Sequence, residues 1–126
     1  MTDLVAIQIT STPSIELNLA LIENQIKQLA NKPQLVVLPE CFAFFGGRDK
    51  AQIDIAETAD NGPIQSALSA LAKRYNKWIV AGTVPIKPLK NKIESLVKEK
   101  FYAASLVYDS EGMLVSRYDK IHLFDV

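Results

Sequence analysis

The 126-residue sequence contains one cysteine, one histidine and no long apolar run. A single cysteine cannot form an internal disulfide, and one histidine is too few for the usual zinc sites. No apolar run approaches the ~18 residues of a membrane span. The start, "MTDLVAIQIT", lacks the basic and apolar regions of a signal peptide. These absences predict a cytoplasmic protein with no membrane partner.

Neither sign of charge dominates, because 14 basic residues balance 14 acidic residues. A chain without a strong overall field has no general attraction for nucleic acid or for an anionic membrane. The sequence also lacks GxGxxG, P-loop, HExxH and GxSxG motifs. Dinucleotide binding, P-loop phosphate binding, zincin chemistry and serine hydrolase chemistry therefore have no support.

The first 38 residues read as a strand, a helix and a second strand. Residues 4–9 are apolar except at Gln8, which predicts a strand buried on both faces. Thr12 and Pro13 predict a helix start, as N-cap and first helical residue. Apolar residues then recur at spacings of four and three, at Ile15, Leu19, Ile22, Ile26 and Leu29. With "QLVVL" as the second strand, this βαβ unit predicts parallel strands joined by a right-handed crossover.

The rest of the chain predicts one more helix and three more strands. Gly62 and Pro63 open a helix with a buried stripe at Ile64, Leu68, Leu71 and Tyr75. "KWIVAGTV" predicts a third strand, and "FYAASLVYD" and "MLVSRYD" predict an antiparallel hairpin. This order predicts an α/β fold with a mixed sheet. The lysine-rich segment 87–100 is interpreted as a solvated excursion rather than a docking patch for an acidic partner.

Glu40 follows the apolar run "LVVL" and Pro39, at the carboxyl end of the second predicted strand. Ligands of parallel α/β sheets bind outside that edge. A carboxylate placed there against apolar walls can act as a general base. An acidic residue that merely closes a strand is equally common, so position alone leaves both interpretations open.

Lys120 follows the last predicted strand, with the apolar residues Ile121 and Leu123 close by. A lysine among apolar residues is unusual, because a solvated lysine needs no such neighbours. One interpretation is a buried cation that faces a carboxylate and stabilises a developing oxyanion. The other is a lysine whose stem packs at the strand end while its head reaches water. His122 is expected to be structural.

Cys41 adjoins Glu40, which suggests a thiol nucleophile beside its base. In an extended segment, however, neighbouring side chains point to opposite faces, so the two should not share a pocket. No cationic residue or histidine that would activate a thiol lies within three positions. Cys41 is therefore predicted to be a small core residue that faces away from Glu40.

The stretches "VAIQIT", "LVVLPECF", "WIVAGTVP" and "SLVYDSEGMLVSRYDKIHLFDV" follow one another from residue 4 to the last residue. Together they resemble the carbon–nitrogen hydrolase (nitrilase) superfamily, with "LPE" and "YDKIHLFD" as the specific signatures. "PECF" and "KIHLFD" most resemble the Nit branch, which contains omega-amidases and deaminated glutathione amidases. The resemblance implies an α-β-β-α sandwich, of which residues 1–126 form the N-terminal half, an incomplete carbon–nitrogen hydrolase domain.

The resemblance also implies a chemistry. Family enzymes cleave small-molecule amides with a Glu–Lys–Cys triad, need no metal or organic cofactor, and commonly form homodimers. Glu40 matches the general base and Lys120 matches the lysine that holds the oxyanion. The nucleophilic cysteine belongs to a later G-x-x-x-C-Y-D-like motif, which the sequence does not reach by Val126.

The chain alone is therefore expected to be inactive as an amidase. The alternative is a non-catalytic product that serves, if at all, as an interaction module. Two departures from the Nit pattern leave the substrate open. Asp119 stands where the branch often has arginine, and residues 43–45 are apolar where a polar stretch often lines the substrate pocket.

Overall fold

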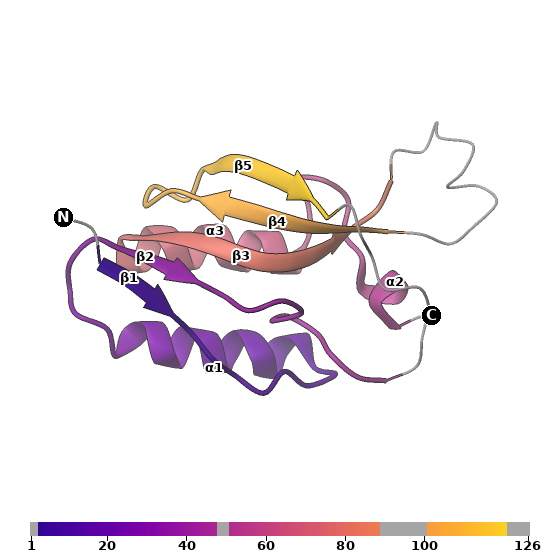
Figure 1. Ribbon diagram of the computed structural model, residues 1–126, viewed down its shortest axis with the longest axis horizontal. Coiled ribbons are helices and arrows are strands. Elements are labelled where there is room, and N and C mark those ends of the chain that lie inside the picture. Colours follow the sequence, from indigo (N-terminus) through magenta and orange to yellow (C-terminus); the bar gives the residue numbers. More distant parts are fainter. Residues whose placement is uncertain (1–2, 48–50, 89–100, 121–126) are drawn as a thin grey trace.

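A computed structural model describes residues 3–47, 51–88 and 101–120 of the chain. Its helices and strands follow one another as β1 (Asp3–Ala6), α1 (Ile15–Lys27), β2 (Gln34–Val37), α2 (Ala51–Ile55), α3 (Pro63–Tyr75), β3 (Lys77–Ile86), β4 (Tyr102–Tyr108) and β5 (Leu114–Asp119) (Figure 1). The predicted α/β alternation with a final hairpin is confirmed, whereas the short helix α2 was not predicted. Residues 89–100 and His122 lie outside the described residues, so the expectations for them stay predictions.

The strands form one mixed sheet in the order β1-β2-β3-β4-β5. β1, β2 and β3 pair in parallel, which confirms the predicted βαβ unit. β4 runs antiparallel to β3 and to β5, which confirms the hairpin. β5 therefore runs in the same direction as β1, β2 and β3. The carboxyl ends of these four strands meet at one edge of the sheet.

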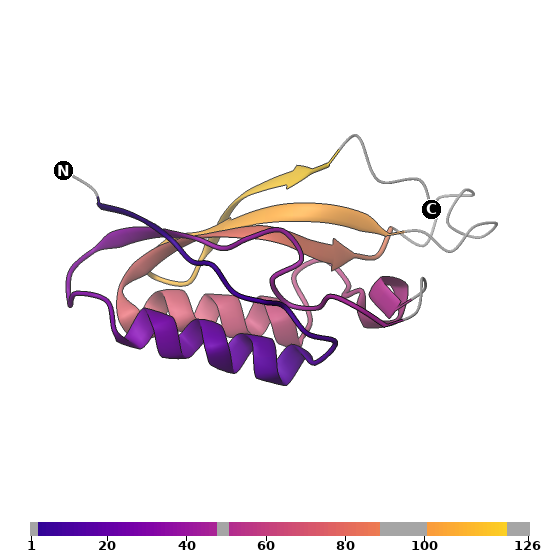
Figure 2. The same ribbon diagram turned by 60° about the horizontal axis from the view of Figure 1, so that its bottom comes forward.

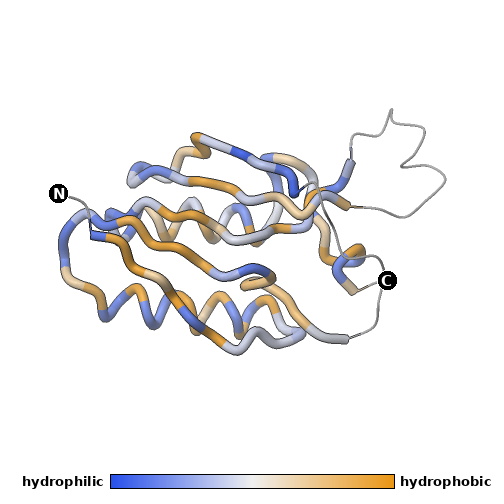
Figure 3. Tube along the Cα trace, viewed as in Figure 1, coloured by the Kyte–Doolittle hydropathy of each residue, from blue (hydrophilic) through white to orange (hydrophobic). Residues whose placement is uncertain are grey.

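Helices α1 and α3 lie side by side on one face of the sheet (Figure 2). Ile22 and Ile26 of α1 and Ile64 and Leu68 of α3 are fully buried, so both predicted apolar stripes are confirmed. The hydropathy-coloured trace shows the matching apolar residues along the strands (Figure 3). This layer between helices and sheet is the hydrophobic core.

Neither α1 nor α3 covers the opposite face of the sheet (Figure 2). Leu4, Leu35 and Trp78 are neighbours across β1, β2 and β3. Leu4 is 70% exposed and Trp78 is 44% exposed. The prediction of a first strand buried on both faces over residues 4–9 is therefore wrong for the described structure. β1 ends at Ala6, and the residues along it alternate between half-buried and exposed.

Helix α1 begins two residues later than predicted, with Ser14 as its N-cap. The Ser14 hydroxyl accepts the N–H of Leu17 at 3.2 Å. Thr12 binds the fully buried Asn18 instead, because its N–H and its hydroxyl both donate to Asn18 Oδ1 at 2.9 Å. Asn18 Nδ2 donates in turn to the carbonyl oxygen of Ala43 at 2.7 Å. Asn18 thus ties the start of α1 to the loop that follows β2.

Helix α3 begins at Gly62 and Pro63, as predicted. The carboxylate of the buried Glu57 accepts the N–H of Ile64 at 2.6 Å and that of Gln65 at 3.1 Å. A carboxylate there satisfies two unpaired donors of the first turn and complements the helix dipole. Gly62 is required next to it, because a Cβ atom at this position would overlap the Glu57 carboxylate.

Candidate active site

Glu40 and Lys120 meet at the carboxyl edge of the sheet. Lys120 Nζ donates a hydrogen bond to Glu40 Oε1 at 2.8 Å. Glu40 lies just beyond β2 and Lys120 lies just beyond β5, two strands that run in the same direction. Lys120 therefore does face a carboxylate, and that carboxylate is Glu40.

The side chains of the pair both reach solvent. The Glu40 side chain is 51% exposed and the Lys120 side chain is 31% exposed. Sequence reasoning left open whether apolar walls would enclose Glu40 and whether Lys120 would be buried, and the described residues enclose neither side chain. The physical reason is the position of both residues beyond their strands, outside the core between helices and sheet.

The backbone around Glu40 is held against an irregularity in β3. The pairing of β3 with β4 shifts register between Ala81 and Val84, which places Gly82 and Thr83 in a β-bulge. A Cβ atom at position 82 would overlap the carbonyl group of Pro39, so only glycine fits there. Thr83 Oγ1 accepts the N–H of Cys41 at 2.9 Å. The bulge thus contacts the residue before Glu40 and the residue after it.

The backbone of Lys120 is hydrogen-bonded to the neighbouring strand β4. Its N–H donates to the carbonyl oxygen of Ala103 at 2.9 Å, which extends the β4–β5 ladder by one residue. The preceding residue, Asp119, accepts a hydrogen bond from Arg117 Nε at 2.8 Å. Asp119, which stands where the Nit branch often has arginine, thus forms an ion pair with Arg117 of the same strand. The Lys120 side chain is directed at Glu40.

Cys41 differs from its prediction in conformation and in burial. Its φ of +55° lies in the left-handed region, so the segment is not extended and the alternation of side chains does not apply. The residue is half-buried and lies outside the core, whereas Phe42 beside it is fully buried. The prediction of a core cysteine is therefore wrong.

Among the described residues, the net effect of the surroundings is to raise the pKa of the Cys41 thiol. Burial raises its pKa, and the negative charge of Glu40 raises it further. The Thr83 hydroxyl and the positive charge of Lys120 act in the opposite direction but are weaker. A thiol whose pKa is raised is protonated at neutral pH and is a poor nucleophile.

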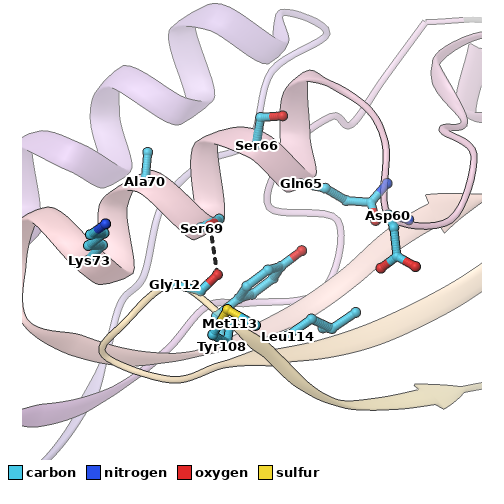
Figure 4. A pocket seen from close by; sticks show the side chains of 10 residues that line it. All are labelled: Asp60, Gln65, Ser66, Ser69, Ala70, Lys73, Tyr108, Gly112, Met113 and Leu114. Carbon is cyan, nitrogen blue, oxygen red and sulfur yellow. Dashed lines mark hydrogen bonds between the residues drawn. The ribbon is translucent and has the colours of Figure 1, made fainter.

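A hollow of about 560 Å³ lies elsewhere, between α3 and the β4–β5 turn (Figure 4). Its lining includes Ser66, Ser69 and Lys73 from α3 and Tyr108 and Met113 from the hairpin. Burial, followed by the charges of two nearby acidic residues, raises the pKa of Tyr108 to about 12. The tyrosine is therefore neutral at physiological pH, and the hollow includes neither member of the Glu40–Lys120 pair.

The described parts of the chain show no group of three or more histidine, cysteine, aspartate or glutamate side chains suited to a metal ion. Within the same parts, no helix is long and apolar enough to cross a bilayer.

Two residues of the site were missed by sequence reasoning, namely Gly82 and Thr83. The signal was present in "WIVAGTV", where a glycine interrupts an otherwise apolar strand. Glycine inside a strand often marks a bulge or a close approach of another backbone. Which backbone approaches could not be predicted, because it comes from a segment more than 40 residues earlier.

Known proteins share both the sequence and the fold of this chain. It is 38% identical over 120 residues to a deaminated glutathione amidase of Yersinia enterocolitica, which covers 95% of this chain and 40% of that protein. It is 30% identical over 95 residues to the omega-amidase NIT3 of Saccharomyces cerevisiae, which covers 74% of this chain and 30% of that protein. The chain thus spans well under half the length of these relatives.

The crystal structure of the Caenorhabditis elegans NitFhit protein superposes with a TM-score of 0.76 at 28% sequence identity. The superposition covers 100% of this chain and 30% of that one. The family profile described as carbon-nitrogen hydrolase matches residues 4–126. The relatives are Nit proteins, as the "PECF" and "KIHLFD" stretches predicted. The chain therefore belongs to the carbon–nitrogen hydrolase family.

Proposed function

We propose that this chain carries two of the three catalytic residues of an amidase that converts a small-molecule amide to a carboxylic acid and ammonia. Glu40 is the general base and Lys120 binds the oxyanion. The nucleophilic cysteine lies in a segment downstream of Val126. On its own the 126-residue chain is inactive, it needs no cofactor, and the full-length form is a cytoplasmic homodimer.

The observation that carries this proposal is the 2.8 Å contact between Lys120 Nζ and Glu40 Oε1. An ion pair as exposed as this one typically contributes only about 0–1 kcal/mol to stability. The pair is therefore expected to contribute little to stability, whereas a base beside a cation suits acyl transfer. The names of the amidase relatives agree with this chemistry.

The proposed reaction has two steps. Glu40 takes the proton of the cysteine thiol, and the sulfur attacks the amide carbon while Lys120 stabilises the negative charge on the oxygen. The C–N bond breaks, and ammonia leaves with the proton that Glu40 had accepted. Glu40 then removes a proton from water, which attacks the thioester and releases the acid and the free thiol.

The proposal is tested by reading the coding DNA past codon 126 and by assaying ammonia release. We expect the reading frame to continue into a G-x-x-x-C-Y-D-like stretch, and we expect the continued protein to release ammonia from omega-amide substrates. The 126-residue chain should release none. Thiol-dependent ammonia release by the short chain alone would contradict the assignment of the nucleophile.

The alternative is a non-catalytic interaction module, and one observation favours it. The sheet face opposite the helices exposes Leu4, Trp78 and Tyr118, at 70%, 44% and 57%. An exposed apolar sheet face is typical of an interaction surface. A genuine stop codon directly after codon 126, so that no G-x-x-x-C-Y-D-like motif is translated, would favour this alternative over the amidase.

A further inference from the structure

We propose that the β3 bulge formed by Gly82 and Thr83 is the positioning element that holds Glu40 opposite Lys120. In this proposal Thr83 is a positioning residue, which acts on Glu40 through the backbone of Cys41. Its importance for catalysis depends on the proposed amidase function. Its effect on the position of Glu40 does not.

The first contact is made on the N-terminal side of Glu40. Leu38 donates its N–H to the carbonyl oxygen of Val80 at 2.9 Å, which continues the β2–β3 ladder to the last residue before Pro39. At Gly82 the backbones then approach so closely that an added Cβ atom would overlap the Pro39 carbonyl and lie 2.6 Å from the Leu38 carbonyl oxygen. Because position 82 has no side chain, the backbone of Pro39 can lie against β3. This close approach determines the position of the residue directly before Glu40.

The second contact is made on the C-terminal side of Glu40. Cys41 adopts a left-handed conformation, at a φ of +55°, which costs a non-glycine residue about 1 kcal/mol. The hydrogen bond from the Cys41 N–H to Thr83 Oγ1, at 2.9 Å, favours this conformation. Threonine is suited to the role, because its β-branched side chain has few rotamers and holds the hydroxyl in place.

The two contacts together leave Glu40 little backbone freedom. One residue on each side of Glu40 contacts adjacent positions of the same strand, so the backbone at Glu40 is restrained from both sides. β-Bulges commonly aim side chains at the edge of a sheet. Here the bulge faces the turn that places Glu40 within 2.8 Å of Lys120 Nζ.

The test compares Thr83→Val, which removes the hydroxyl at nearly constant shape, with Thr83→Ser, which keeps it. Both are made in the 126-residue chain, with and without Lys120→Met. Amide hydrogen exchange at Cys41 reports the hydrogen bond directly. The carboxyl ¹³C chemical shift of Glu40 reports its coupling to Lys120, as the change that Lys120→Met produces.

We expect Thr83→Val to speed exchange at Cys41 about tenfold, as for the loss of one hydrogen bond. It should also shrink the response of the Glu40 shift to Lys120→Met, and Thr83→Ser should restore both readouts. Protection of Ile79 and Val84 in β3 is the control for the fold. If Thr83→Val loses that protection, Thr83→Ala removes the hydroxyl without placing a methyl group against the Cys41 N–H.

Unchanged exchange at Cys41 in a folded Thr83→Val chain would overturn the proposal. So would faster exchange with an undiminished response of Glu40 to Lys120→Met, because the bond would then not position Glu40. Neither readout requires catalysis. Failure of the amidase function would appear separately, as absence of ammonia release from a continued protein whose Glu40 is correctly placed.

Discussion

Lys120 Nζ lies 2.8 Å from Glu40 Oε1, although 80 positions separate the two residues in the sequence. The contact depends on topology, because β2 and β5 run in the same direction on either side of β3 and β4. Lys120 directly follows β5, Glu40 comes three residues after the end of β2, and both reach the same edge of the sheet. This is the edge at which α/β proteins bind ligands.

Glu40→Gln should abolish amidase activity in a form of the protein continued to the length of its relatives, with a loss of about 10²–10⁴-fold in kcat. The substitution removes the base and keeps the size of the side chain. Cys41→Ala is the matched control and should retain most activity, because the Cys41 thiol is protonated at neutral pH. Ammonia release measures both. A Cys41→Ala protein that folds but is inactive would mean that the assignment of the nucleophile is wrong.

Gly82→Ala should destabilise the chain by about 1–3 kcal/mol, because the new methyl group overlaps backbone that cannot move away easily. Urea unfolding measures the change. Gly47→Ala is the control, since among the described residues its Cβ atom would meet only Ala51 Cβ, at 3.4 Å. The left-handed φ of Gly47, +79°, should limit its cost to about 1 kcal/mol. Equal losses in the two variants would argue against the close approach at Gly82.

Lys77→Met should cost about 2–4 kcal/mol of unfolding free energy, because Lys77 is almost fully buried. Its Nζ donates to the carbonyl oxygens of Ala30 and Lys32 and to Gln34 Oε1, at 2.7 to 2.8 Å. Methionine fills the space but leaves these acceptors without their donor. The exposed Lys73→Met is the control and should change stability by less than about 0.5 kcal/mol. If Lys77→Met also changed the free energy of unfolding by less than about 0.5 kcal/mol, the proposed stabilising role of the Lys77 hydrogen bonds would be contradicted.

Tyr108→Phe should remove part of the alkaline destabilisation of the chain. The pKa of Tyr108 is raised from 10.0 to about 12, so the folded state retains a proton that the unfolded state loses. The stabilisation is complete below pH 10 and is lost as the pH rises toward 12, with a slope of at most about 1.4 kcal/mol per pH unit. Urea unfolding from pH 9 to pH 11.5 compares the wild type with Tyr108→Phe. A Tyr108→Phe chain that keeps the wild-type slope would contradict this prediction.

The apolar spacings of the sequence predicted most of the fold. Ile22 and Leu68, at the centres of the two stripes, are fully buried, and the other residues of the stripes are buried or half-buried against the core, since helical periodicity reports directly which side chains meet a core. The N-cap at Ser14 was missed because Thr12, an equally good cap by type, is bound to Asn18. That partner is visible only in three dimensions.

The site was harder to predict than the fold. The positions of Glu40 and Lys120 after strands indicated that they would lie at the sheet edge, but not how exposed they would be. The predicted extended conformation of Cys41 was wrong, because the observed conformation is favoured by a hydrogen bond to Thr83, a residue of another strand. Sequence patterns indicate contacts between residues that are close in the sequence. The bulge in β3 instead contacts the segment that follows β2, which is distant in the sequence.

Trp78 gives the uncovered sheet face a spectroscopic reporter. It is the sole tryptophan of the chain, and it lies 44% exposed beside Leu35 on that face. Its fluorescence in the isolated chain should be red-shifted and open to quenching by acrylamide. Any protein segment that seats on the face should shift the emission to the blue, so covering of the sheet can be titrated without a label.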